Sequence, residues 1–384
     1  MKWAAATLLV GWALAAAESR AESFADILGQ TAITRPLTEA MADTVGRSIP
    51  VPAASAGVVF TFDKESHAFV RERELGGQLF LERPRPLGRG KWNLSLDYEW
   101  IKFDQVDGQD IDDLSDTAPP IVDPQTNALF TVPRFDLGLT THQVTMSATY
   151  GVTDDLDVSL TLPLLYSVFD VDVALRVVGP GQVQRASRHE TAFGPGDLLL
   201  RGKYRFVKAP WGDLAAGLVL RLPTGNEDDF QGTGSVEVLP ALYAATSPVA
   251  LGERVRLQGY ANAGLDLVAD DVGRSEGRFG LGLDCAVAGR VAFGAAFLAR
   301  EQFQAVVPTD AFDVERFDPA TGARFQAPLF GLEGGRQSFY DFSLGGRVML
   351  WRDTVIGFAN VLLPLNDDGF RSNVIPLVGV EAVF

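Results

Sequence analysis

Hydrophobic and polar residues alternate along most of this chain from residue 91 onward. In the segment "LDVSLTL", for example, the residues at 156, 158, 160 and 162 are apolar, and those between them are polar. A repeat of two residues places the apolar and polar side chains of an extended strand on opposite faces. Comparable stretches, separated by turn residues, recur up to the last residue. The pattern therefore predicts an all-β protein built from two-faced strands.

The predicted strands and the lengths of their connections favour a barrel. We place strands at 91–104, 134–150, 156–177, 196–208, 213–223, 234–247, 254–268, 276–288, 290–304, 338–351, 354–365 and 373–384. The connections at 151–155, 209–212, 248–253, 289 and 352–353 are short, whereas those at 105–133, 178–195, 224–233, 269–275, 305–337 and 366–372 are mostly longer and polar. Short turns at one end and long loops at the other are typical of transmembrane barrels. We therefore expect a transmembrane antiparallel up-and-down β-barrel of about twelve strands, an even number as bacterial barrels require.

A soluble β-sandwich also has alternating strands, so the connections rather than the alternation favour the barrel, and the end of the chain fits a barrel as well. The segment "NVIPLVGVEAVF" ends on Phe384 without a polar tail. If Phe384 faces lipid, so do Val380 and Val378, whereas Glu381 and Gly379 face the interior. In a closed barrel the last strand pairs with the first, so hydrogen bonds hold the terminus in place. Aromatic residues that could form interfacial girdles stand near strand ends at Trp92, Trp100, Tyr150, Tyr204 and Trp351.

The region before the barrel divides into two parts. Residues 1–21 have an early lysine, an apolar run and small residues near the end, which predicts a cleaved signal peptide and export. Residues 22–90, called the N-terminal segment below, predict either a plug inside the barrel or a loose periplasmic segment. The stretch 57–91 predicts a short hairpin and one further strand-like piece. The glycine pairs Gly280/Gly282 and Gly345/Gly346 mark places where another part of the chain could approach closely, as a plug would.

Composition narrows the function classes. The formal net charge of −16 argues against nucleic-acid binding and against a basic membrane-surface protein. Cys285 is the single cysteine, so no disulfide can form within the chain. Beyond the signal peptide, no run approaches the roughly 18 apolar residues of a spanning helix. These features fit a bacterial outer-membrane barrel with acidic loops.

Four stretches resemble a known family: "YGVTDDLDVSLTLPLL", "GPGDLLLRGKYRF", "LRLPTGNEDDFQGTG" and "NVLLPLNDDGFRSNVIPLVGVEAVF". They are similar to the outer-membrane family named for the meta-pathway of phenol degradation, and the resemblance covers most of residues 57–384. It implies a barrel with a transport function and supplies no binding residues. The terminal Phe384 also looks like the C-terminal signal of outer-membrane barrels, which implies insertion by the barrel-assembly machinery.

Catalytic and metal-binding patterns are weak. The histidines His67, His142 and His189 lie on different stretches, without a G-x-S-x-G elbow, so we do not expect an enzyme. The acidic loop "DQVDGQDIDDLSD" supplies carboxylate oxygens suited to calcium, but it departs from the EF-hand spacing. A solvated surface loop, or a divalent-ion bridge to lipopolysaccharide, explains it. We assign no cofactor and no metal.

The residues that face the lumen give more information about function than the catalytic and metal-binding patterns do. Strand alternation points ten residues inward: Arg201, Lys203, Arg205, Arg221, Arg256, Tyr260, Asp266, Arg278, Arg300 and Arg347. One interpretation is that the charged members pair with acids across a narrow lumen and fill it. The other is that the excess of arginine lines a path for an anionic or aromatic solute. For most of these residues we favour pairing.

These features together predict a passive channel for small, hydrophobic or aromatic solutes across the outer membrane. The alternative is a structural or surface-interaction barrel without transport, because fold alone does not give function. The expected partners are outer-membrane lipid and lipopolysaccharide, the barrel-assembly machinery during insertion, and a small solute. No nucleic-acid partner is expected.

Overall fold

The computed structural model describes residues 24, 45–47, 51–53, 60–63, 68–71, 76, 79–123, 126–179, 181–351 and 354–384. The predicted signal peptide at 1–21 lies outside the described residues. Among these residues, no helix has the length and apolar content needed to cross a membrane.

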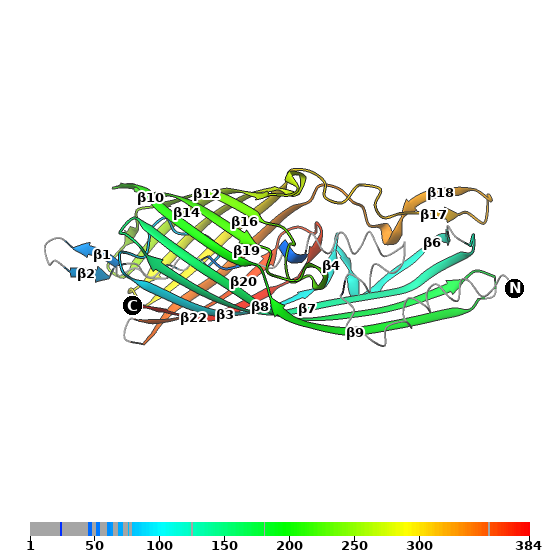
Figure 1. Ribbon diagram of the computed structural model, residues 1–384, viewed down its shortest axis with the longest axis horizontal. Helices are drawn as coiled ribbons and strands as arrows, with labels where there is room; N and C mark the ends of the chain where they lie inside the picture. The colour runs from blue at the N-terminus through cyan, green and yellow to red at the C-terminus, as the bar shows by residue number, and fades with distance from the viewer. Residues whose placement is uncertain are drawn as a thin grey trace.

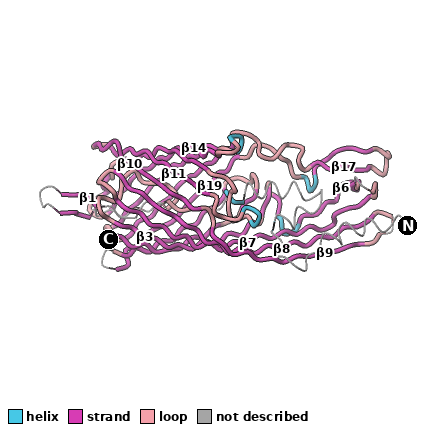
Figure 2. The backbone as a smooth tube through the Cα atoms, viewed as in Figure 1, coloured by secondary structure: helices cyan, strands magenta, loops and turns pink. Residues whose placement is uncertain are grey.

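Twelve antiparallel strands close into a barrel, as predicted (Figures 1 and 2). In order around the wall they are β3 (Trp92–Phe103), β7 (Leu129–Gly151), β8 (Leu156–Val177), β10 (Leu198–Ala209), β11 (Gly212–Leu222), β12 (Glu237–Thr246), β14 (Val255–Val268), β15 (Glu276–Val287), β16 (Val291–Gln302), β19 (Ser338–Trp351), β20 (Val355–Pro364) and β22 (Ile375–Val383). The pairing of β22 with β3, with Val378 opposite Tyr98, closes the ring. A closed ring leaves no unpaired strand edge in the barrel wall, which a hydrocarbon solvent requires.

The last strand confirms the predicted alternation. Val378, Val380 and Phe384 are 52, 45 and 54 % exposed, whereas Glu381 is 3 % exposed. The N–H of Phe384 donates to the carbonyl of Trp92 at 3.0 Å, and its own carbonyl accepts from the N–H of Trp92 at 2.8 Å. The chain therefore ends inside the hydrogen-bonded wall.

Aromatic side chains mark two levels on the outer face of the barrel. Trp92 packs on Tyr150 near the short turns, with ring centroids 4.7 Å apart. Near the long loops, Trp100 of β3 lies directly opposite His142 of β7, and His142 lies directly opposite Tyr166 of β8. Eight residues separate Trp92 from Trp100, or about 26 Å of strand. At a tilt of about 40° this gives a height of about 20 Å, close to the apolar band of outer-membrane barrels.

The end with long loops, called the long-loop end below, carries structure that the sequence did not predict. The connection at 178–195 was expected to be a loop, but it contains β9 (Val183–Pro195), which pairs along the outer half of β8. The connection at 105–133 contains β4 (Gln105–Val106), β5 (Gln109–Asp110), the 3-10 turn η1 (Ile111–Asp113) and β6 (Leu114–Val122), and β7 begins at Leu129 rather than at 134. The connection at 305–337 contains the hairpin β17 (Asp313–Phe317) and β18 (Arg324–Pro328), followed by η4 (Leu329–Gly331).

The outer parts of β7 and β8, together with β6, β9, β17 and β18, therefore form an extension beyond the barrel, seen on the right in Figure 1. The hydrophobic pattern did not predict β9 because this strand is polar on both faces, where it contains Arg185, Arg188 and Glu190. Its side chains alternate between exposed and half-buried, and β8 is the strand paired with it. A strand with so little burial has no apolar repeat to reveal it.

The remaining elements are small. They are β13 (Val249–Leu251), β21 (Phe370–Arg371), and the 3-10 turns η2 (Glu227–Asp229) and η3 (Val272–Arg274). The predicted N-terminal hairpin is present as β1 (Phe60–Asp63) and β2 (Ala68–Arg71). Figure 1 places this hairpin beyond the barrel at the end where the chain terminates, called the short-turn end below.

An apolar core fills the long-loop end. It is built from inward-facing residues of β7 and β8, such as Phe135, Leu139 and Phe169, and from loop residues such as Phe330. The ring of Phe135 lies 5.2 Å from that of Phe330, so the loop at 305–337 packs against the outer part of β7. The interior thus changes from apolar at this end to charged further along the lumen.

Candidate functional site

The predicted lumen residues lie on the inward faces of β10, β11, β14, β15, β16 and β19. Lys203, Arg205, Arg221, Tyr260, Asp266 and Arg347 are 9 % exposed or less, and Arg201, Arg278 and Arg300 are partly accessible inside the barrel. Arg256 differs, because it stands near the short-turn end of β14 and is exposed. The strand alternation thus places the other nine within one enclosed space.

Most of these cations have carboxylate partners. Arg278 lies between two acids: its Nε is 2.8 Å from Glu276, and its Nη2 contacts Asp266. Arg300 shares Glu276 at 3.8 Å and lies over the ring of Phe339 at 4.4 Å. Two further pairs are Arg221 with Glu237 at 3.1 Å and Arg347 with Glu381 at 3.8 Å. Charges removed from water are tolerated when they are paired in this way.

Described parts of the N-terminal segment lie against the same wall. Three ion pairs join them to it: Arg47–Glu237 at 3.1 Å, Glu82–Lys203 at 3.4 Å and Arg85–Asp213 at 2.5 Å. Each wall residue in these pairs also has a partner in the wall itself: Arg221 for Glu237, Asp157 for Lys203 and Arg205 for Asp213. The segment therefore adds to a charge network that the wall already contains.

Apolar contacts also join the N-terminal segment to the wall. Leu81 packs over Gly280, where a Cβ would overlap the leucine side chain. This is the close approach expected at that glycine. Near the long loops, Phe24 stacks on Phe169 with centroids 5.0 Å apart and lies 6.1 Å from Phe230. Contacts at both levels place Phe24 and Leu81 of the segment inside the barrel, whereas the β1–β2 hairpin lies beyond it.

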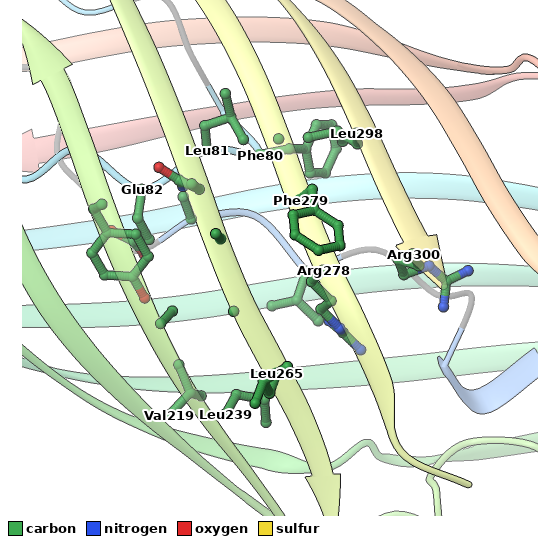
Figure 3. A pocket seen from close by; sticks show the side chains of 18 of the residues that line it. Phe80, Leu81, Glu82, Val219, Leu239, Leu265, Arg278, Phe279, Leu298 and Arg300 are labelled. Carbon is green, nitrogen blue, oxygen red and sulfur yellow. The ribbon is translucent and has the colours of Figure 1, made fainter. Parts of the chain in front are cut away.

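A cavity of about 250 Å³ remains between the N-terminal segment and the wall (Figure 3). Phe80, Leu81 and Glu82 face it from the segment, and Arg278 and Arg300 stand on the neighbouring strands of the wall. Its other lining residues include Leu199, Arg201, Val219, Arg221, Leu239, Tyr243, Leu298 and Asp341. A mostly apolar space with a few polar groups suits a small organic molecule.

The candidate catalytic and metal groups lie elsewhere. His142 is on the outer face of β7, where its Nδ1 is 2.7 Å from the hydroxyl of Tyr98. His189 contacts Asp170 at 2.5 Å on the exposed extension, and His67 lies outside the described residues. In the described chain, no group of three or more His, Cys, Asp or Glu side chains could hold a metal ion.

Hydrogen bonds and ion pairs account for part of the acidic loop. Asp110 accepts the N–H of Asp112 at 3.0 Å and so caps η1. Asp112 in turn pairs with Lys102 at 2.6 Å. This loop therefore has a structural role at the start of the extension.

Sequence reasoning missed several residues of the cavity. Tyr243 shares an inward face with Leu239 on β12, so alternation could have identified it, but it carries no charge that draws notice. The acids Glu237 and Glu276, which pair with arginines of the cavity wall, stand near the ends of predicted strands, where the inward face is hard to assign. Arg47 and Glu82 come from a region whose position in the lumen has no sequence signal.

Comparisons with known proteins were made for the whole chain. A scan against protein-family models finds no match, and a search of curated proteins finds none. Among solved structures, an outer membrane channel from Pseudomonas putida F1 has 16 % identity, with 78 % of this chain and 98 % of that chain covered and a TM-score of 0.42. The NanC porin has 6 % identity, 75 % and 98 % coverage, and a TM-score of 0.40. A FadL homologue from Pseudomonas aeruginosa has 11 % identity, 77 % and 90 % coverage, and a TM-score of 0.28. The barrel assignment rests on the closed sheet of this chain.

Proposed function

We propose that this protein is an outer-membrane channel for passive passage of small, apolar or aromatic solutes. The observation that carries the proposal is the cavity enclosed between the lumen wall and the N-terminal segment. A barrel with a completely filled interior would serve only as a structural element. The motif resemblance to the outer-membrane family named for the meta-pathway of phenol degradation supports the same function.

The proposed route runs along the lumen. A solute enters through the apolar core at the long-loop end, around Phe135 and Phe330, reaches the cavity, and leaves at the short-turn end. Both steps need movement: the loop at 305–337 at the entrance and the N-terminal segment at the exit. No energy source is required, because the solute follows its concentration gradient.

The second candidate function is a structural or surface-interaction barrel without transport. It is favoured by the extensive pairing of the lumen charges and by the contacts of Leu81 and Arg47 with the wall. In that case the N-terminal segment occupies the lumen permanently. The two functions differ in whether weakening the segment's contacts opens a path.

Proteoliposomes test this difference with the intact mature chain. The uptake of labelled benzoate and of neutral benzamide is measured at pH 8 for the wild type and for the double variant Arg47→Ala/Arg85→Ala. These substitutions remove segment charges whose wall partners, Glu237 and Asp213, each keep another arginine. The barrel is therefore expected to stay folded, which the heat-dependent electrophoretic mobility of the folded barrel checks.

Faster uptake by the double variant than by the wild type supports a channel that the segment occludes. The matched control is the double variant Lys102→Ala/Arg324→Ala, which removes two positive charges outside the lumen whose partners are Asp112 and Glu315. If neither protein admits either solute faster than protein-free liposomes, the structural alternative replaces the channel.

A further inference from the structure

Arg201 stands apart from the other lumen arginines. Its one hydrogen bond is from Nη1 to the carbonyl oxygen of Pro52 at 3.2 Å. In the described chain no carboxylate oxygen lies within 4.0 Å of it. The nearby carboxylate of Glu82 pairs with Lys203 instead. A guanidinium has five N–H donors in a fixed fork, so most of those of Arg201 remain available.

Tyr243 offers a second unused donor beside the same cavity. The residue is 7 % exposed, and its ring packs against Gly217, where a Cβ would overlap it. Its hydroxyl makes no hydrogen bond to any described residue. This hydroxyl can therefore donate a hydrogen bond to a molecule in the cavity. Arg201 and Tyr243 both line this cavity, on β10 and β12, with β11 between them.

The remaining walls limit the kind of ligand. Leu199, Val219, Leu239 and Leu298 are apolar residues of the cavity lining. The other arginines of the cavity wall, unlike Arg201, are held by the acids described above. A molecule with one negative charge and an apolar body therefore satisfies the cavity, whereas a second charge would meet either leucine side chains or a carboxylate.

We propose that Arg201 and Tyr243 bind the carboxylate of a small monocarboxylic acid whose apolar body lies against the leucines. This inference deepens the proposed channel function by naming its solute class, and it rests on that function for its biological meaning. The volume of about 250 Å³ equals about eight water molecules at about 30 Å³ each. An acid the size of benzoate fits this space.

Equilibrium binding of labelled benzoate to the full mature protein in detergent micelles tests the site. Neutral benzamide has nearly the same shape and serves as the uncharged probe. We expect saturable benzoate binding in the wild type, about tenfold or more tighter than benzamide binding, because a charge-assisted hydrogen bond is lost with the amide. Arg201→Gln should weaken benzoate binding by about tenfold or more and leave benzamide binding within about twofold.

Two further variants separate this site from general electrostatics. Tyr243→Phe keeps the ring over Gly217 and removes only the hydroxyl, so benzoate binding should weaken by about fivefold. Arg256→Gln removes an equal inward-facing charge near the short-turn end and should leave binding unchanged. If Arg201→Gln and Arg256→Gln have the same effect, or if benzoate binds no better than benzamide, the acid site is wrong.

The outcomes distinguish this inference from the channel proposal. Uptake of benzamide and benzoate without Arg201-dependent binding would overturn the acid site and leave the channel in place. Arg201-dependent binding without uptake would support the site and reject the channel. Electrophoretic mobility before and after heating confirms that each variant is folded.

Discussion

One buried ion pair joins the β17–β18 hairpin to the rest of the extension, which gives a sharp prediction. Arg316 of β17 is 1 % exposed and holds Asp116 of β6 through two bonds, at 3.1 and 2.6 Å. The same guanidinium donates to the carbonyl of Pro119 at 3.0 Å and to that of Pro328 at 2.7 Å. One side chain thus joins β6 to both strands of the β17–β18 hairpin.

The substitution Arg316→Met keeps the length of the side chain and removes its charge and its donors. The four bonds share one side chain, so their energies do not add, and the appropriate measure is the cost of leaving a buried charge without its partner. That cost is about 3–5 kcal/mol, and Asp116 is too buried for water to replace the arginine. We therefore expect the free energy of opening the hairpin to fall by this amount.

The measurement is hydrogen–deuterium exchange of the peptide spanning 313–328 in the folded protein. A loss of 3–5 kcal/mol corresponds to faster exchange by about two to four orders of magnitude. Arg324→Met is the matched control, because Arg324 lies on the same hairpin but is exposed and contacts Glu315 at 3.4 Å. An exposed pair contributes about 0–1 kcal/mol, so exchange should change by less than about tenfold.

A third variant tests the reason for the effect. The double variant Asp116→Leu/Arg316→Met removes both buried charges, so it should lower the free energy of opening the hairpin less than Arg316→Met alone does. Equal exchange in Arg316→Met and Arg324→Met would refute the reasoning, because burial would then not matter. Faster exchange in the double variant than in Arg316→Met would show that shape rather than charge holds the hairpin.

Three further predictions concern other parts of the chain. A Cβ at Gly151 would overlap a backbone carbonyl of the N-terminal segment, so Gly151→Ala should lower the thermal midpoint, whereas Gly202→Ala, with open space around it, should not. Phe384→Ser should reduce the amount of folded barrel in outer-membrane fractions more than Phe279→Ser, although both side chains are about equally exposed, if the terminal residue is the insertion signal. Burial raises the pKa of Asp107 above 3.8, so the loop around Asp107 should gain stability as the pH falls through that raised pKa. Amide exchange of this loop measures the effect, and the pH dependence should be lost in Asp107→Asn.

The barrel wall was predictable because lipid imposes a strict repeat on it. The strand predicted at 338–351 is observed as Ser338–Trp351, and that at 276–288 as Glu276–Val287. Each of these strands has mostly apolar side chains toward lipid and mostly polar or small ones toward the lumen, so alternation indicates its limits and its faces. Strand β9 has no such alternation, because it lies outside the apolar band and is paired with β8 alone.

The cavity was only half predictable for a related reason. Alternation identifies Arg201 as inward-facing, but it does not say that Arg221 has an acid partner and Arg201 has none. That difference depends on Glu237 and on a segment about 150 residues earlier in the chain, around Pro52. Long-range pairing of this kind leaves no periodic signal in a single sequence.

The two kinds of buried ion pair in this protein have different consequences for movement. Glu237 contacts Arg47 of the N-terminal segment and Arg221 of the wall, both at 3.1 Å, so departure of the segment leaves Glu237 with a partner. Arg316 and Asp116 have no such spare charge among the described ion pairs, and separating them leaves each one buried alone. The cost of breaking a buried pair arises mainly from the charge left behind. The same chemistry therefore makes separation of Arg47 from Glu237 less costly than separation of Arg316 from Asp116.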